Sequence, residues 1–427
     1  MPERHRVRGL RIGLVGHGFM GRAHSFAWRV VDQVYDGIAQ PVLAAVAGQH
    51  QERAERAAAQ LGFESSVADW RVLVDRTDID IIDICTPVDT HAEIALAALA
   101  AGKHVLCEKP LARTAEEAEL LVASAASARQ HGVLAMVGFN YRRLPAVALA
   151  RELVQEGAIG TLRHVRARYL QDWLSSDRDP WSWRLDAAQA GAGALGDIAS
   201  HLVDLVAHVT DTRISSVAGM TDTFVSSRSA DPPGGLRPVT VDDACAFLSR
   251  SAGGLAAVFE ASRCAPGRKN QLSLELNGSD GSIVFDLERL NELGFYSRAD
   301  QPSASGFRTI LVTDPSHPYL DAWWPPGHTL GWDHSFVHQA GDFLLAAVTG
   351  QPCAPDFADG LYVQNVVDAV ALSGRTGAWQ RVAGVTAPTA NGGNDGAAGK
   401  PEIVAQRYPG DAASARSAAG NRMEGQR

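Results

Sequence analysis

The sequence predicts an α/β chain in two parts: a doubly wound parallel sheet at the N-terminus, followed by an α+β domain with a largely antiparallel open sheet. Short apolar runs that alternate with helical patterns from residue 10 to about residue 138 predict the first part. Alternating runs with hairpin signals after about residue 140 predict the second. A length of 427 residues agrees with two domains, because single hydrophobic cores rarely grow beyond roughly 250 to 300 residues.

The strands of the first part read as nearly continuous apolar runs, which is typical of strands buried on both faces of a parallel sheet. These runs are RIGLV, VLAAVAG, DIDIIDICTP, KHVLCEKP and VLAMVGF. One of the helical segments between them has marked ends: Thr114 and Glu117 have the spacing of a capping box, and Gly132 stops the segment. The pattern therefore predicts repeated strand–helix–strand units.

The second part contains the clearest hairpin signal of the chain. In QLSLELNGSDGSIVFDL, the pairs Asn277-Gly278 and Asp280-Gly281 lie between two alternating runs. Helices are expected at residues 197 to 209 and 333 to 349. We therefore expect strands and helices to be mixed in this part, with most strand pairs antiparallel.

From Ala387 onward the chain is rich in Gly, Ala, Asn and Ser and has few large apolar residues. Such a segment cannot offset the entropy lost on ordering, so a disordered tail is expected. The expected divisions are a first domain at residues 1–139, a second domain at 140–386 and the tail at 387–427.

The composition narrows the class of function. The chain has 39 Lys and Arg against 48 Asp and Glu, a net charge of -9, which argues against a nucleic-acid partner. No apolar run approaches the roughly 20 residues that span a bilayer, and the N-terminus lacks a signal-peptide core, so no membrane partner is expected. The five cysteines show neither a disulfide pattern nor metal-site spacing. We expect a cytoplasmic protein that acts on small molecules, without a metal.

A glycine motif follows the first apolar run directly. Gly16 permits a tight turn, Gly18 lets the backbone approach a pyrophosphate, and Gly21 lets the next helix pack on the strand. The N-terminus of that helix then faces the anionic phosphates. The strand before the motif and the strand–helix units after it predict a dinucleotide-binding Rossmann domain.

The end of the second strand decides between NAD and NADP in such domains. It reads Ala47-Gly48-Gln49-His50, with neither the acid that favours NAD nor an adjacent arginine that would favour NADP. Arg53, one helical turn further on, is placed to reach a phosphate. The cofactor is therefore expected to be NAD or NADP, with a slight preference for NAD.

Two sites have the residue types of a hydride-transfer enzyme. Lys109 ends the apolar run KHVLCEKP, and the carboxyl end of a parallel strand points into the ligand crevice; a solvated lysine is the alternative. Asp197 and His201 lie four residues apart, so one helix face would let the carboxylate orient an imidazole that takes a hydroxyl proton. The spacing alone also fits a surface pair, or an N-cap beside an unrelated histidine.

These motifs together resemble the Gfo/Idh/MocA family, named after glucose–fructose oxidoreductase, inositol dehydrogenase and rhizopine catabolism. The resemblance runs from about residue 10 to 385 and rests on GLVGHGFMG, CTP, CEKP and GDIASH. It implies that Lys109, Asp197 and His201 are the catalytic group and that Thr86 and Pro87 border the nicotinamide. The implied cofactor-binding residues are Gly16, Gly18, Phe19, Met20, Gly21, Gln49, Arg53, Thr86, Pro87, His91, Glu108 and Lys109.

Further stretches resemble members of the family that oxidise the 3-hydroxyl of pyranoses: FNYRRLPAVALA, YLQDW, SWR and GSIVF. They imply that Tyr141, Gln171, Trp173 and Arg184 line a sugar pocket. Those members have an acidic residue where this chain has Gly48. The resemblance thus implies NAD(P)-dependent hydride transfer to or from a secondary hydroxyl, at C3, of a pyranose or anhydrosugar.

Two other functions stay open at this point. A myo-inositol or other cyclitol dehydrogenase would use the same three catalytic residues with a different pocket lining. A catalytically silent dinucleotide-binding regulator could share the fold, although such a protein need not keep both Lys109 and His201. The broad open sheet expected of the second domain suggests a homodimer or homotetramer.

Overall fold

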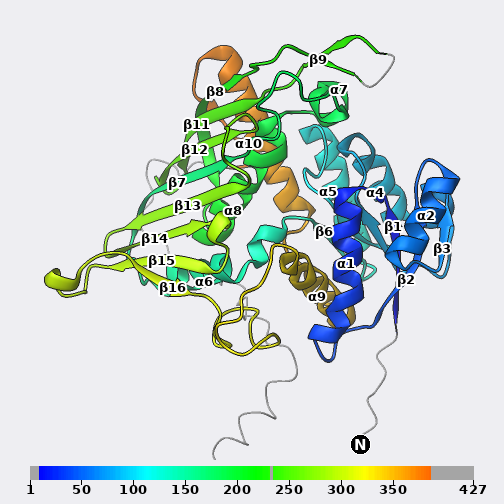
Figure 1. The fold of residues 1–427 in the computed structure, drawn as a ribbon, viewed down its shortest axis with the longest axis horizontal. Helices are drawn as coiled ribbons and strands as arrows, with labels where there is room; N and C mark the ends of the chain where they lie inside the picture. Colours follow the sequence, from blue (N-terminus) through cyan, green and yellow to red (C-terminus); the bar gives the residue numbers. More distant parts are fainter. Residues whose placement is uncertain (1–8, 231–233, 386–427) are drawn as a thin grey trace, which may run out of the picture.

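The computed structural model describes residues 9–230 and 234–385, so the tail predicted at 387–427 lies outside the described residues. Two sheets lie side by side, each with its own helices (Figure 1). Among the described residues, no helix has both the length and the apolar character needed to cross a bilayer.

The first sheet has six parallel strands in the order β3-β2-β1-β4-β5-β6, which confirms the predicted doubly wound Rossmann sheet. The strands are β1 (Leu10–Val15), β2 (Pro41–Ala47), β3 (Ser65–Val67), β4 (Ile81–Ile84), β5 (His104–Cys107) and β6 (Ala135–Val137). From β1 the chain adds β2 and β3 on one side, and it then crosses back to add β4, β5 and β6 on the other side. The strand order therefore reverses between β1 and β4. Ligands of such sheets bind at this point, beyond the carboxyl ends of the strands.

Helices cover both faces of this sheet. They are α1 (Phe19–Val34), α2 (Gln51–Leu61), α3 (Trp70–Asp75), α4 (His91–Ala100) and α5 (Ala115–Arg129). Apolar residues of α1 and α2 share one buried cluster with α9 (His334–Thr349), whereas α3, α4 and α5 contribute to another. Helix α9 confirms the helix expected at 333–349, and it packs against α1 although it comes late in the chain.

Helix α5 begins with half of the predicted capping box. The Thr114 hydroxyl accepts from the backbone N–H of Glu117 (3.3 Å). The Glu117 carboxylate, however, accepts from the backbone N–H of Arg113 (3.1 Å), one residue before the cap, and also pairs with the Arg113 guanidinium. The ion pair draws the carboxylate away from the position that a full capping box requires.

The second sheet has nine strands in the order β16-β15-β14-β13-β7-β12-β11-β8-β17, and every pair except β7–β12 is antiparallel, as predicted. Its strands are β7 (Leu162–Leu170), β8 (Ile214–Asp222), β11 (Ala244–Ser251), β12 (Ala256–Ser262), β13 (Gln271–Gly278), β14 (Gly281–Asp286), β15 (Glu292–Ser297), β16 (Arg308–Leu311) and β17 (Gln380–Arg381). Strands β13 and β14 form the hairpin predicted from the sequence. A separate two-stranded ribbon contains β9 (Ser227–Ser229) and β10 (Leu236–Pro238).

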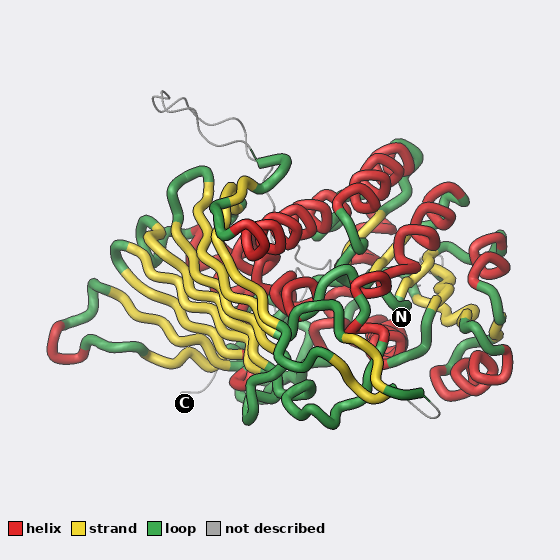
Figure 2. Tube along the Cα trace, turned by 90° about the horizontal axis from the view of Figure 1, so that it is seen from above, coloured by secondary structure: helices red, strands yellow, loops and turns green. Residues whose placement is uncertain are grey.

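Helices α6 (Pro145–Gln155), α8 (Ser200–Thr210) and α10 (Phe357–Thr376) lie on one face of the nine-stranded sheet (Figures 1 and 2). The short helix α7 (Ala187–Ala190) lies in the long connection between β7 and α8. Along β12, Ala257, Phe259 and Ala261 are buried, whereas Val258 and Glu260 between them are exposed. One face of the sheet therefore packs on helices, and the other presents side chains outward.

Candidate active site

The turn between β1 and α1 has contacts that only glycine allows. Gly16 has a φ of +92°, and a Cβ there would lie 2.7 Å from the carbonyl oxygen of Cys85. A Cβ at Gly21 would lie 2.2 Å from the carbonyl oxygen of Gly16. At Gly18, in contrast, a Cβ would meet nothing within 4 Å. The turn thus has open space at the first N–H groups of α1, and this cradle fits the pyrophosphate of a dinucleotide.

A histidine occupies the place where an acid would bind the adenosine ribose. A Cβ built on Gly48 would lie 2.6 Å from Nε2 of His17, so the imidazole fills the space beside the end of β2. Gln49 and Arg53, the other two residues considered at this end, are both exposed. A side chain at position 48 would therefore require the His17 ring to move.

Two residues expected to bind the cofactor, His91 and Glu108, have hydrogen-bond partners within the protein. The ring nitrogens of buried His91 lie 3.0 Å from the carbonyl oxygens of Thr86 and Pro110. The Glu108 carboxylate is 4% exposed; Oε1 lies 3.0 Å from Nε2 of His24, and Oε2 accepts from the backbone N–H of Lys109. Both side chains are buried with polar atoms engaged, so they also support the crevice, and their contact with the cofactor stays a prediction.

Lys109 follows β5 and reaches across to the second half of the chain. Its Nζ donates to Oδ1 (3.0 Å) and to the backbone carbonyl oxygen (2.7 Å) of Asp197. Burial opposes ionisation of Asp197, but the nearby cations, Lys109 first and then Arg263 and Arg184, hold the pKa of this carboxyl below its ordinary value. The carboxylate is therefore ionised and fixes the lysine ammonium at the carboxyl edge of the first sheet.

The segment that carries Asp197 begins with a π-helical turn (Leu195–Ala199) and continues as α8. The Asp242 carboxylate anchors this turn by accepting from the backbone N–H groups of Gly193 (2.8 Å) and Leu195 (2.7 Å). The sequence predicted that Asp197 would orient His201 across one turn of α-helix, and this contact does not form. The i→i+5 pattern of a π-turn changes the relative direction of the two side chains, and Asp197 binds Lys109 instead.

His201 lies in an aromatic enclosure and is 6% exposed. Its ring centroid lies 4.6 Å from that of Tyr141, 5.8 Å from that of Phe139 and 6.1 Å from that of Tyr169. Burial, reinforced by the charge of Lys109 and only partly opposed by Asp197, lowers the pKa of His201 well below its ordinary value. The imidazole is therefore neutral near pH 7 and able to accept a proton.

Three of the four predicted sugar-pocket residues belong to one hydrogen-bonded chain. The Tyr141 and Tyr169 hydroxyls lie 3.0 Å apart. Gln171 Nε2 lies 3.3 Å from the Tyr169 hydroxyl, and Trp173 Nε1 donates to Gln171 Oε1 (2.9 Å). The Tyr141 ring also lies against that of His201 in a tilted arrangement, so the hydrogen-bonded chain begins beside this histidine. Its amide and hydroxyl groups have the chemistry that binds sugar hydroxyls.

Arg184, the fourth, lies apart from this chain. Its guanidinium stacks over the Trp183 ring at 4.4 Å, and its charge contributes to the lowered pKa of Asp197. Its backbone carbonyl oxygen accepts from the buried Arg263. Arg184 is thus electrostatically connected to the lysine–aspartate pair.

Three further residues that the sequence analysis did not single out contact this hydrogen-bonded chain. Tyr169 lies in β7 and precedes Gln171, the residue directly after this strand, by two positions, so strand alternation could have placed both side chains on the same side. Asn270 accepts from Tyr169 (2.7 Å) and Gln171 (2.8 Å), but only the pairing of β13 with β7 brings it there. Trp332 donates to the Tyr141 hydroxyl (3.2 Å) and stacks on Phe19 of the glycine turn (5.5 Å between centroids). No short-range pattern in the sequence indicates that contact.

Comparison with known proteins agrees with this arrangement. Residues 10–139 match the model of an oxidoreductase family with an NAD-binding Rossmann fold, and residues 147–284 match that of the GFO/IDH/MocA C-terminal domain. This chain belongs to the Gfo/Idh/MocA oxidoreductase family. The N-terminal part of this Gfo/Idh/MocA protein is accordingly an NAD-binding domain, and the chain is an oxidoreductase.

The family includes curated relatives of stated activity. The chain is 41% identical to levoglucosan dehydrogenase of Pseudarthrobacter phenanthrenivorans over 395 residues, which cover 89% of this chain and 100% of that protein. It is 26% identical to glucose-6-phosphate 3-dehydrogenase of Bacillus subtilis, with coverages of 84% and 94%. A solved structure of levoglucosan dehydrogenase with NADH and levoglucosan superposes with a TM-score of 0.85 at 41% identity, covering 88% of this chain and 99% of that one.

Proposed function

We propose that this Gfo/Idh/MocA protein oxidises a secondary hydroxyl, at C3, of a pyranose sugar or anhydrosugar with NAD. The observation that carries the proposal is the ammonium of Lys109, held by Asp197, beside the neutral imidazole of His201 at the carboxyl edge of the dinucleotide-binding sheet. The relatives that act on levoglucosan and on C3 of glucose 6-phosphate support the substrate class.

Lys109, His201 and Asp197 have different roles in the proposed reaction. Lys109 donates a hydrogen bond to the reacting oxygen and stabilises the alkoxide that develops there. His201 accepts the hydroxyl proton; Nδ1 is enclosed, which leaves Nε2 as the accepting nitrogen. Asp197 holds the ammonium in place. The glycine turn would hold NAD, which would supply the acceptor for the hydride that leaves the carbon bearing this hydroxyl. In the reverse direction, His201 returns the proton to the ketone oxygen.

The test is a nicotinamide-absorbance assay of the purified protein with NAD and NADP against pyranoses, 1,6-anhydrosugars and cyclitols. We expect NADH formation with a pyranose or anhydrosugar, and a 3-keto product identified by NMR. A cyclitol used in strong preference to every sugar would instead establish the cyclitol dehydrogenase. No turnover with any substrate, together with tight NADH binding, would favour the silent regulator.

The buried state of His201 predicts an unusual pH profile. Because its pKa lies well below the ordinary value of about 6.5, the base stays unprotonated as the pH falls from 8 through 6.5. We therefore expect kcat/KM for sugar oxidation to keep its plateau across this interval and to fall only at lower pH. Initial rates at constant ionic strength provide the measurement. A one-proton decline centred at or above about pH 6.5 that belongs to His201 would contradict the neutral, buried base.

We also propose that the protein is a homodimer or homotetramer joined through the outward face of the nine-stranded sheet. Large apolar side chains gather there: Leu248 is 49% exposed, Val258 48% and Trp379 51%, and all three line one shallow groove. Contiguous apolar surface of this kind is typical of an interface. Sedimentation velocity should show an oligomer that dissociates in Leu248→Asp/Val258→Asp. A monomeric wild type would contradict the proposal.

We further propose a cytoplasmic location. All five cysteines of the described chain are free thiols, as in a reducing compartment. Fractionation of the source cells tests this, and recovery of the protein outside the cytoplasm would contradict it.

A further inference from the structure

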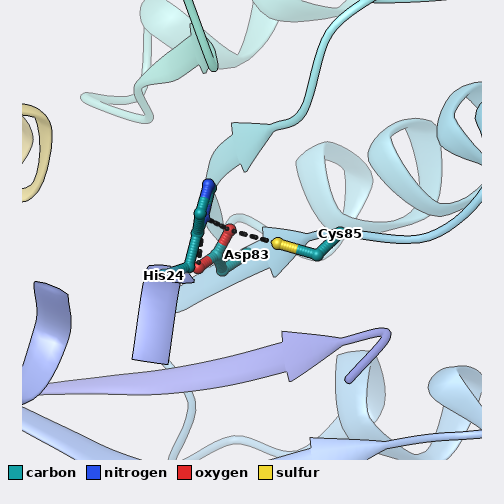
Figure 3. A group of neighbouring side chains, drawn as sticks. All are labelled: His24, Asp83 and Cys85. Atoms are coloured by element: carbon teal, nitrogen blue, oxygen red, sulfur yellow. Dashed lines mark hydrogen bonds and ion pairs between the residues drawn. The ribbon is translucent and has the colours of Figure 1, made fainter. Parts of the chain in front are cut away.

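A buried histidine, His24, contacts Glu108, the residue that precedes Lys109. His24 of α1 is 2% exposed, and its Nδ1 lies 2.9 and 3.0 Å from the two carboxylate oxygens of Asp83. Its Nε2 lies 3.0 Å from Oε1 of Glu108. Figure 3 shows the ring of His24 beside Asp83 and Cys85. An ionised carboxylate only accepts hydrogen bonds, so the ring satisfies both partners when each of its nitrogens carries a proton.

The surroundings of His24 favour this imidazolium. Trp28 Nε1 donates to Asp83 (2.7 Å), and the Cys85 thiol donates to the same carboxylate (3.6 Å). On the opposite side the ring of Phe336 from α9 lies 5.4 Å away and brings no charge. Burial alone would lower the pKa of His24, but the Asp83 carboxylate outweighs it and raises the pKa well above its ordinary value.

The Glu108 carboxylate connects His24 to the backbone of Lys109. Its Oε2 accepts from the backbone N–H of Lys109 (3.2 Å), while Oε1 faces His24. The carboxylate also packs close to Gly138, because a Cβ built on this glycine would lie 2.8 Å from Oε1. The Glu108 side chain therefore has little freedom, and it fixes the backbone from which the lysine extends.

A second buried histidine, His91, contacts Pro110, the residue that follows Lys109. His91 bridges the carbonyl oxygens of Pro110 and Thr86, both at 3.0 Å. Burial lowers its pKa, and a neutral ring donates to one of these carbonyls at a time. Both neighbours of Lys109 are thus connected through a histidine to the strand end of β4, where Asp83 and Thr86 lie.

We propose that His24, as an imidazolium between Asp83 and Glu108, is a positioning residue that sets the place of Lys109 relative to the dinucleotide. His24 belongs to the helix whose first turn forms the pyrophosphate cradle, so one side chain connects that cradle to the lysine. The inference rests on the proposed function, since Lys109 is the group that is positioned. Misplacement of a catalytic group by about 1 Å costs up to about a hundredfold in rate.

A metal ion is the other chemistry that these residues offer. One ligand atom each of His24, Asp83 and Cys85 lies within 4.8 Å of the others. The proton that Nδ1 directs at Asp83 occupies the position a metal would need, and the two states exclude each other. Elemental analysis of the purified protein separates them, because a stoichiometric bound metal would overturn the imidazolium.

The protonation state is measured directly, without turnover, by ¹⁵N NMR of protein labelled in histidine. The signals of His24 are identified by their loss in His24→Gln. We expect both ring nitrogens to show the shifts of an imidazolium up to at least about pH 8, above the ordinary histidine pKa of about 6.5. Neutral-ring shifts at pH 7 would overturn the proposal, whatever the substrate of the enzyme is.

Kinetics of His24→Gln test the positioning. We expect kcat to fall about tenfold to a hundredfold while the dissociation constant for NADH stays within about threefold, because the cradle itself is built from Gly16 to Gly21. His104→Gln is the matched control: His104 lies at the other end of β5, is partly buried and accepts from the backbone N–H of Leu134 (3.0 Å). A kcat in His24→Gln equal to that of the control, or a parallel loss of NADH affinity, would overturn the positioning role.

A second substitution should restore part of the kcat lost in His24→Gln. This double variant also provides a test if the single variant folds poorly. Wild type places one cation between two carboxylates, and His24→Gln leaves the two carboxylates unneutralised. His24→Gln/Asp83→Asn returns the cluster to the wild-type net charge and keeps a donor toward Glu108. We expect this double variant to regain part of the lost kcat. A double variant slower than the single one would contradict the charge argument, whereas an inactive wild type would refute the proposed function instead.

Discussion

Replacing Lys109 with Met should lower kcat at least about a hundredfold, because it removes the donor to the developing alkoxide. The lysine Nζ lies at the carboxyl edge of the first sheet and is held by two contacts with Asp197. Affinity for NADH should change far less, since the pyrophosphate cradle is built around Gly16, Gly18 and Gly21. Steady-state kinetics beside a direct NADH-binding titration measure the two effects separately.

Lys109→Arg sharpens this test. Arginine keeps the positive charge but replaces a compact ammonium by a broad planar group, so we expect it to recover little of the lost turnover. Turnover close to wild type in Lys109→Met would remove this residue from the mechanism. An equal collapse of NADH affinity in that variant would make its role cofactor binding instead.

Replacing His201 with Asn should also lower kcat by at least about a hundredfold, the size expected for loss of a general base. Asparagine is smaller than histidine and cannot take up the proton, while the cofactor cradle is untouched. His131→Asn provides the control, because His131 is exposed next to the end of α5. If His201→Asn turned over sugar at the rate of this control, another group would have to be the base.

The first sheet could be predicted closely from the sequence because its signals are local. Buried parallel strands show as apolar runs, and Gly16 and Gly21 mark a turn whose contacts exclude any Cβ. The hairpin of β13 and β14 was predictable for the same reason, since glycine pairs lie between two alternating runs.

The contacts that the sequence did not indicate join distant segments of the chain. Asp197 and His201 looked paired because their spacing fits an α-helix, but Asp242 anchors a π-turn there, and Lys109 takes the carboxylate. The family resemblance implies that Glu108 contacts the cofactor, but it does not indicate the hydrogen bond between Glu108 and His24, which lies 84 residues away in the sequence. Such pairings follow from the fold, and no pattern within a short window of sequence indicates them.

In the proposed reaction, hydride leaves C3 of a sugar and reaches the nicotinamide. Incubating the wild-type enzyme with NAD and a pyranose or anhydrosugar deuterated only at C3, followed by mass spectrometry of the reduced cofactor, tests it most directly. We expect one deuterium in the NADH and a primary isotope effect on the hydride-transfer step. Unlabelled NADH formed at a normal rate would contradict it, because the hydride would then come from another carbon.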